Sequence, residues 1–108
     1  MYILKGKTPV PTRNAEKWMM WFATADRHVG LTLTSRLKIS TVFTGVNHGF
    51  DYGDPILFET MYRIHGDSWE HCGRYNSWEE AAKGHDRWVM KLLKDSTLTL
   101  HKAFDGIL

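Results

Sequence analysis

The strongest hydrophobic pattern in the chain is helical and lies between residues 77 and 96. Ser77 followed by Glu80 matches a capping box, in which two side chains satisfy free amides at a helix start. Apolar and aromatic side chains, with one histidine among them, then recur on one helical face. They are Trp78, Ala81, Ala82, His85, Trp88, Val89, Leu92 and Leu93. The pattern predicts an amphipathic helix that ends near Asp95 and Ser96.

A second helical pattern covers residues 14–26, where Thr12 or Asn14 can cap the start. The positions at helical spacing are Ala15, Trp18, Phe22 and Ala25. The apolar surface is widened beyond one stripe by Met19, Met20 and Trp21. So wide a face is typical of a helix buried on two sides, and the alternative is an exposed binding patch.

The remaining apolar positions alternate as they do in strands. The predicted strands cover residues 29–33, 38–46, 56–64 and 69–75. A loop is predicted at 47–55, where Gly49, Gly53 and Pro55 interrupt the pattern. Residues 2–4 suit a short edge strand, and residues 5–13 suit an extended arm, because proline lacks the amide that a central strand needs.

Together these elements predict the α+β class, as a two-layer sandwich with about four antiparallel strands and two helices on one face. We expect one domain over residues 1–108, with an N-terminal arm at 1–13 and a C-terminal tail at 97–108. The tail either folds back as a strand or docks on a partner. The other face of the sheet is expected to meet solvent or a partner. It would carry Val42, Thr44, Leu57, Glu59, Met61 and Arg63.

Composition excludes several classes of protein. Of 108 residues 43% are apolar, which is enough for one core. A protein that mimics DNA would be strongly acidic, and the net charge of +2 excludes that class. The single cysteine, Cys72, cannot form an intramolecular disulfide, as expected of a reduced intracellular protein. Because there is no apolar run of a leader or membrane span, we expect a cytoplasmic protein without membrane association.

Several ordered segments resemble a family of small uncharacterised proteins encoded by phages and prophages. They are ADR at 25–27, STVF at 40–43, NHGF at 47–50, PILFETM at 55–61, RY at 74–75, WEEA at 78–81 and GH at 84–85. The resemblance spans roughly residues 18–88 and implies a phage accessory protein acting in the infected bacterial cell, without implying an activity. Members often carry an acid where this chain has Asn47, and they tend to end soon after the second helix. The tail is therefore expected to be peculiar to this chain.

The six histidines raise the question of metal or catalytic chemistry. His65, His71 and Cys72 lie close in sequence, but their spacing matches no paired zinc pattern. His48, in a glycine-flanked loop, and Glu59, the one acid in the third strand, could serve as acid and base, with Cys72 as nucleophile. The structural alternative is that His48 orders its loop and that Glu59 pairs with a nearby arginine. His85 suits a hydrogen-bonded core position, and no pattern typical of a bound cofactor occurs.

Nucleic-acid binding is a further alternative. The basic residues in or beside the strands are Arg36, Lys38, Arg63 and Arg74. Bases could stack on Trp69, Tyr62 and Tyr75. The other reading of these residues is an ordinary solvated surface whose basic groups are balanced by acids.

The leading hypothesis is a non-enzymatic phage protein that binds a host protein or an antiviral defence complex, such as a CRISPR effector. Tryptophan and methionine exceed what so small a core needs, and aromatic residues favour interfaces. The expected binding residues are Met19, Met20, Trp21, His48, Phe50, Tyr52 and Trp69. A nucleic-acid-binding regulator, a small enzyme or metal protein, and a homodimer built through the open sheet face or the tail are the alternatives.

Overall fold

The computed structural model describes residues 1–49 and 53–105, with side chains described as far as Lys94. Its elements are β1 (Tyr2–Lys5), β2 (Thr8–Pro11), α1 (Ala15–Thr24), β3 (His28–Leu33), β4 (Leu37–Phe43), β5 (Phe58–Ile64), β6 (Glu70–Tyr75) and α2 (Trp78–Asp105). They form an antiparallel sheet in the order β3-β4-β5-β6 and a separate β1-β2 hairpin. The predicted α+β class, with four antiparallel strands and two helices packed against the sheet, is confirmed.

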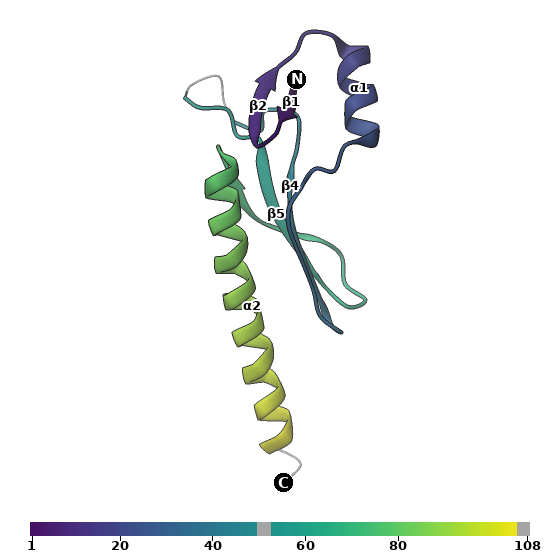
Figure 1. Cartoon of the computed structure of the whole chain (residues 1–108). Coiled ribbons are helices and arrows are strands. Elements are labelled where there is room, and N and C mark those ends of the chain that lie inside the picture. Colours follow the sequence, from purple (N-terminus) through teal and green to yellow (C-terminus); the bar gives the residue numbers. More distant parts are fainter. Residues whose placement is uncertain (50–52, 106–108) are drawn as a thin grey trace.

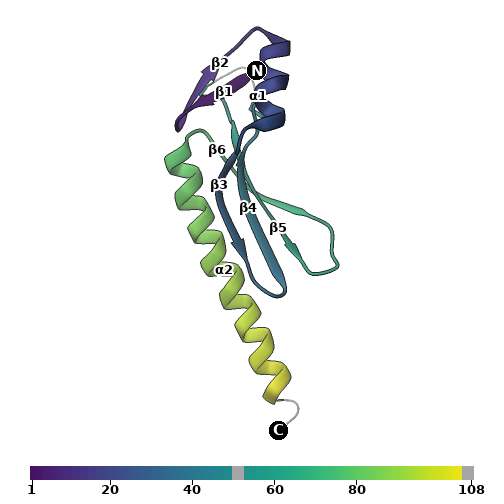
Figure 2. The ribbon, with the colours of Figure 1, turned by 45° about the vertical axis from the view of Figure 1, so that its right-hand side comes forward.

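Helix α2 lies along one face of the sheet, and its C-terminal part extends past the ends of the strands (Figures 1 and 2). It contacts all four strands. Helix α1 lies beside the hairpin and reaches the same side of the sheet through Trp21, whose ring meets Phe43 edge-on at 5.7 Å between centroids. One face of the sheet therefore carries the core.

The centre of the core is a set of aromatic rings between the sheet and α2. Phe43 and Phe58 are fully buried and lie 5.4 Å apart, and Phe58 contacts Trp78 at 6.3 Å, both in edge-to-face geometry. Leu57 joins this core, so its predicted place on the opposite face is wrong. The reason is that β5 begins only at Phe58, and Leu57 precedes the alternation of the strand.

Glycines allow α2 to approach the sheet closely. A side chain at Gly30 of β3 would meet the ring of His85 at 2.8 Å, and one at Gly84 of α2 would meet the ring of Tyr75. Gly73 of β6 likewise lies under the Tyr75 hydroxyl. Glycine in a helix interior costs about 1 kcal/mol relative to alanine, so close packing is the physical reason for Gly84.

Buried polar groups between α2 and the sheet form one continuous chain of hydrogen bonds. The Thr60 hydroxyl donates to the Tyr75 hydroxyl at 3.1 Å, so Thr41 donates to Thr60 at 2.6 Å. Thr41 must then accept from Nδ1–H of His85 at 2.8 Å, which leaves Nε2 to accept from Thr32 at 2.9 Å. His85 is therefore a satisfied core residue in its neutral Nδ1–H form.

Acid is expected to weaken the fold through His85. Burial lowers the pKa of His85 below its ordinary 6.5. Below pH 6.5 the unfolded chain therefore binds more protons than the folded chain does. The stability that neutral His85 contributes is fully present above pH 6.5 and is lost as the pH falls. The loss has a limiting slope of about 1.4 kcal/mol per pH unit. Urea unfolding between pH 7.5 and 5 should show a steeper loss of stability for the wild type than for His85→Gln.

The matched control for this titration is His65→Gln, which removes an exposed histidine. It should keep the wild-type dependence on pH. Equal slopes for the wild type and His85→Gln would show that His85 is not the group responsible.

Both helix starts follow the sequence pattern. The side chain of Asn14 caps α1 by accepting from the Lys17 amide at 3.0 Å. At the start of α2 the Ser77 hydroxyl accepts from the Glu80 amide at 3.2 Å. The Glu80 carboxylate accepts from the amide of Asn76, one residue before the Ser77 amide that a capping box would use.

Two terminal predictions were wrong. Residues 8–11 of the expected arm form β2 in a hairpin with β1, in register Leu4↔Pro9 and Tyr2↔Pro11, because prolines are tolerated at the edge positions of a two-stranded ribbon. Over residues 97–105 the tail does not fold back as a strand, since α2 continues to Asp105, and docking of the tail on a partner stays a prediction. No glycine or proline interrupts residues 85–105, so nothing in the backbone stops the helix at Asp95. Within the described ranges, neither helix combines the length and the hydrophobicity that crossing a bilayer requires.

Candidate functional site

The face of the sheet that points away from α2 is the main candidate for a binding surface, and we call it the open face. Strand register places side chains of all four strands on it. The open face comprises His28, Leu31, Leu33, Lys38, Ser40, Val42, Glu59, Met61, Arg63, His71 and Arg74. The predicted members Val42, Glu59, Met61 and Arg63 are among them, whereas Thr44 lies beyond the end of β4.

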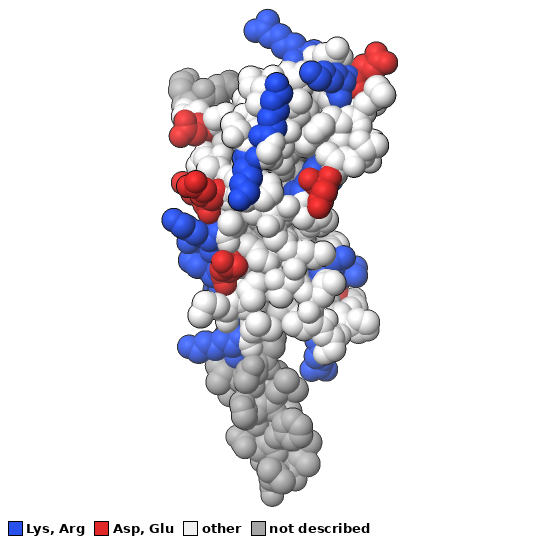
Figure 3. All heavy atoms as spheres, in the orientation of Figure 1, with Lys and Arg blue, Asp and Glu red and all other residues white. Residues whose placement is uncertain are grey.

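The apolar part of the open face is centred on β3. Leu31 is 46% exposed and Leu33 is 63% exposed, although both belong to a regular strand. Val42 and Met61 on the neighbouring strands are half-buried. In the view of Figure 3, the middle of the molecule has a broad uncharged area with charged side chains at its margins.

Two cations stand side by side on the open face. Lys38 and Arg63 are direct partners in the register of β4 and β5. Both lie against the ring of Trp69, with Lys38 Nζ 5.7 Å and Arg63 Cζ 5.2 Å from its centroid. Among the described residues, neither has a carboxylate within ion-pair distance. Like charges directly opposite each other repel, so this pair favours the binding of an anion between them.

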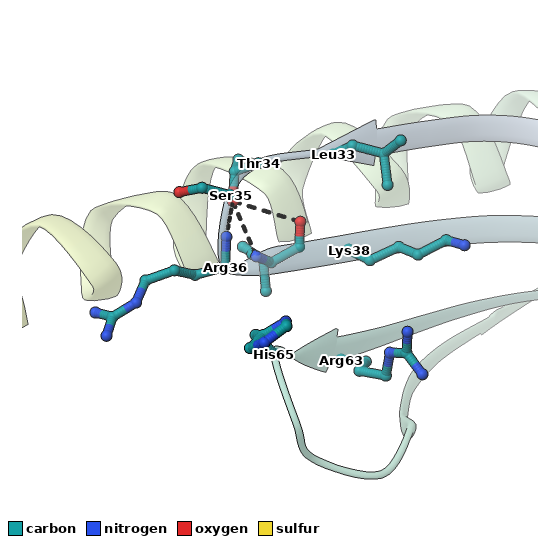
Figure 4. Close-up of a pocket in the computed structure, with 8 residues that line it drawn as sticks. Leu33, Thr34, Ser35, Arg36, Lys38, Arg63 and His65 are labelled. Carbon is teal, nitrogen blue, oxygen red and sulfur yellow. Dashed lines mark hydrogen bonds between the residues drawn. The ribbon is translucent and has the colours of Figure 1, made fainter.

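The open face ends in a shallow basic hollow of about 190 Å³ at the β3–β4 turn. It is lined by Leu33, Thr34, Ser35, Arg36, Leu37, Lys38, Arg63 and His65. Figure 4 shows Lys38 and Arg63 extending toward the same end of the hollow, while Arg36 points the other way from the turn. The Thr34 hydroxyl holds this turn by accepting from the amides of Arg36 and Leu37 at 3.3 and 2.9 Å.

The one carboxylate of the open face is already paired. Glu59 Oε1 lies 2.7 Å from His71 Nδ1 and 3.7 Å from Arg74 Nε, and only 8% of the Glu59 side chain is exposed. The expected alternative, in which Glu59 pairs with a nearby arginine, is the arrangement seen. The proposed catalytic partner His48 is not its neighbour in this pair.

Cys72 is poorly suited to be a nucleophile. Burial raises the pKa of its thiol to about 11, and the charge of Glu59 adds to the effect. The thiol contacts the Thr60 carbonyl at 3.6 Å. Because the thiolate is the reactive form, a thiol held protonated at neutral pH reacts slowly.

The predicted loop residues are only partly described. Phe50 and Tyr52 lie outside the described residues. His48 is exposed, and its amide donates to the Ile56 carbonyl at 2.9 Å. Asn47 organises the loop, because its Oδ1 accepts from the amides of Gly49 and Ile56 at 2.8 and 2.9 Å. A carboxylate oxygen at this position would accept the same two bonds, so an acid there has a structural role as well.

The three predicted metal ligands are placed apart. His65 lines the basic hollow, His71 pairs with Glu59, and Cys72 contacts a backbone carbonyl. Within the described part of the chain, no three histidine, cysteine or acidic side chains come together as metal ligands.

The predicted patch on α1 divides in two. Met19 and Met20 are 64% and 67% exposed, whereas Trp21 is half-buried against Phe43. Exposure of the two methionines fits the binding-patch interpretation, and the placement of Trp21 fits burial.

Two of the three aromatic rings considered for base stacking face the core. Tyr62 stacks on Trp88 at 6.4 Å, and Tyr75 is buried beneath α2. Only Trp69 remains on the open side among these three, and its ring is already in contact with Lys38 and Arg63.

Sequence reasoning did not single out Leu31 and Leu33 as surface residues. Their alternation with Gly30 and Thr32 was visible, but leucine is usually the residue that faces the core. A bulge between His28 and Gly30 shifts the register, and Gly30 and Thr32 face α2 instead. The signal available in the sequence was Gly30, because a residue without a side chain leaves space for a helix on its face of the strand.

Comparison with known proteins identifies no relative: no family model, no curated protein and no solved structure matches this chain.

Proposed function

We propose that this protein acts without catalysis, by binding another macromolecule through the open face of its sheet. The observation that carries the proposal is that α2 covers one face only, while Leu31 and Leu33 stay exposed beside Lys38 and Arg63, which have no carboxylate partner among the described side chains. An exposed apolar area rimmed by polar groups is typical of an interaction surface.

The setting of this binding follows from the resemblance to phage-encoded proteins. We propose an accessory protein that acts in the cytoplasm of an infected bacterium, with a host protein or a defence complex as its target. Five residues of the resembling segments build the junction between α2 and the sheet: Thr41, Thr60, Tyr75, Gly84 and His85.

The candidate chemistry gives less support to an enzyme. Cys72 is protonated at neutral pH, and Glu59 is hydrogen-bonded to His71 and paired with Arg74 rather than with His48. A reaction centre needs a nucleophile or base aimed at a site where substrate can sit. We therefore place binding ahead of catalysis.

The test uses two matched pairs of surface substitutions. Leu31→Ser/Leu33→Ser removes the apolar part of the open face, and Met19→Ser/Met20→Ser removes the exposed methionines of α1. We expect proteins captured from a nuclease-treated bacterial lysate to bind the open-face variant about tenfold more weakly, because two interface leucines are lost. The methionine variant should capture them as the wild type does.

Quantitative mass spectrometry of the captured proteins measures this difference. Thermal unfolding of both variants should stay close to the wild type, since the four side chains are exposed. Capture that depends on Met19 and Met20 and not on the leucines would move the binding site to α1. Size-exclusion chromatography of the protein alone tests whether the bound partner is a second copy of this chain.

A further inference from the structure

Building on the proposed role of the open face, we propose that its partner is an acidic protein segment. Carboxylates of that segment bind Lys38 and Arg63, and its apolar side chains cover Leu31 and Leu33.

The first reason is charge complementarity at the cation pair. Lys38 and Arg63 repel each other across β4 and β5, and within the described residues their shared contact is the ring of Trp69. A carboxylate between them would relieve that repulsion and make charge-assisted hydrogen bonds to both. Arg36 also lines the basic hollow, but its side chain points away from Lys38 and Arg63 (Figure 4).

The second reason is that apolar and cationic groups lie in one row. Leu33, Lys38 and Arg63 are successive register partners across β3, β4 and β5. Strands lie about 4.8 Å apart, so the row spans roughly 10 Å. Side chains two positions apart in an extended segment are separated by about 7 Å. A single segment with carboxylates next to apolar side chains can therefore contact the whole row.

The third reason is that the open face does not repel an acidic partner. Its own carboxylate, Glu59, is almost wholly buried, is hydrogen-bonded to His71 and forms an ion pair with Arg74. The other charged side chains of this face are positive: Arg63 and Arg74 are exposed, and Lys38 is half-buried.

A nucleic acid fits this surface less well. Sequence-tolerant binding of single strands relies on several aromatic platforms, and Tyr62 and Tyr75 face α2 instead of the open face. The exposed Leu31 and Leu33 would lie among phosphates without a matching group. These leucines are better matched by apolar side chains of a protein.

The experiment measures fluorescence anisotropy with labelled soluble probes. The probes are a random copolymer of glutamate and tyrosine, a copolymer of lysine and tyrosine, and a single-stranded oligothymidine. We expect the glutamate–tyrosine copolymer to bind most tightly. Lys38→Glu/Arg63→Glu should weaken that binding at least tenfold, and Lys38→Gln/Arg63→Gln should weaken it about threefold.

The control with the same change of charge is Arg13→Glu/Lys17→Glu, at two exposed positions near the start of α1. It should bind the copolymer nearly as the wild type does. Equal loss in this control, tighter binding of oligothymidine, or no binding of the acidic copolymer would each overturn the inference. If the copolymer fails while the leucine-dependent capture from lysate persists, the binding role stands and only the acidic partner is rejected.

Discussion

Replacing Phe58 by alanine is expected to lower the free energy of unfolding by about 4 kcal/mol. Phe58 is fully buried on β5, between the rings of Phe43 and Trp78. Its loss removes apolar contact area and leaves a cavity that two rigid rings cannot close. A domain of this size is stable by only about 5–15 kcal/mol, so the change removes a large share of the total.

Urea unfolding followed by circular dichroism measures this loss. Leu33→Ala is the matched control, because it shortens an exposed side chain of the same sheet. It should cost less than about 0.5 kcal/mol. Comparable losses at the two positions would contradict the assignment of the core to the α2 side.

Replacing Gly84 by valine is expected to cost about 3 kcal/mol and to loosen α2 from the sheet. The added side chain would occupy space already taken by the ring of Tyr75. That ring cannot retreat easily, since its hydroxyl accepts from Thr60 in the buried hydrogen-bond chain. A valine at Gly84 therefore strains packing and hydrogen bonding together.

The control for this substitution is Lys83→Val, which introduces the same β-branched side chain at an exposed neighbouring position of α2. It should cost about 0.5 kcal/mol, the difference in helix propensity. Thermal unfolding separates the two variants. A Gly84→Val protein as stable as the Lys83→Val protein would show that α2 does not approach the sheet as closely as described.

The consequence for function is that the core fixes the open face. Phe58 and Thr60 alternate along β5 with Glu59 and Met61, so anchoring one set beneath α2 presents the other set to a partner. Substitutions at the core are therefore expected to weaken binding indirectly, through stability. The open-face variants should weaken binding without that loss.

Local sequence pattern determined the starts of both helices, the four strands and the α+β class. Each depends on neighbours a few residues apart: the caps at Asn14 and Ser77, and the alternation in β5. Periodicity also showed that Leu31 and Leu33 share a face. These features follow from the repeat of the backbone itself, so one chain is enough to read them.

Only the tertiary structure decided which side chains of β3 are covered by α2 and which side chains meet across strands. Alternation separates Leu31 and Leu33 from Gly30 and Thr32, but it does not say which of these two sets a helix will bury. The pairing of Lys38 with Arg63 and of Glu59 with His71 depends on strand register between distant parts of the chain. A one-residue shift of register would reverse every such contact, which is why the candidate site could not be assembled from sequence alone.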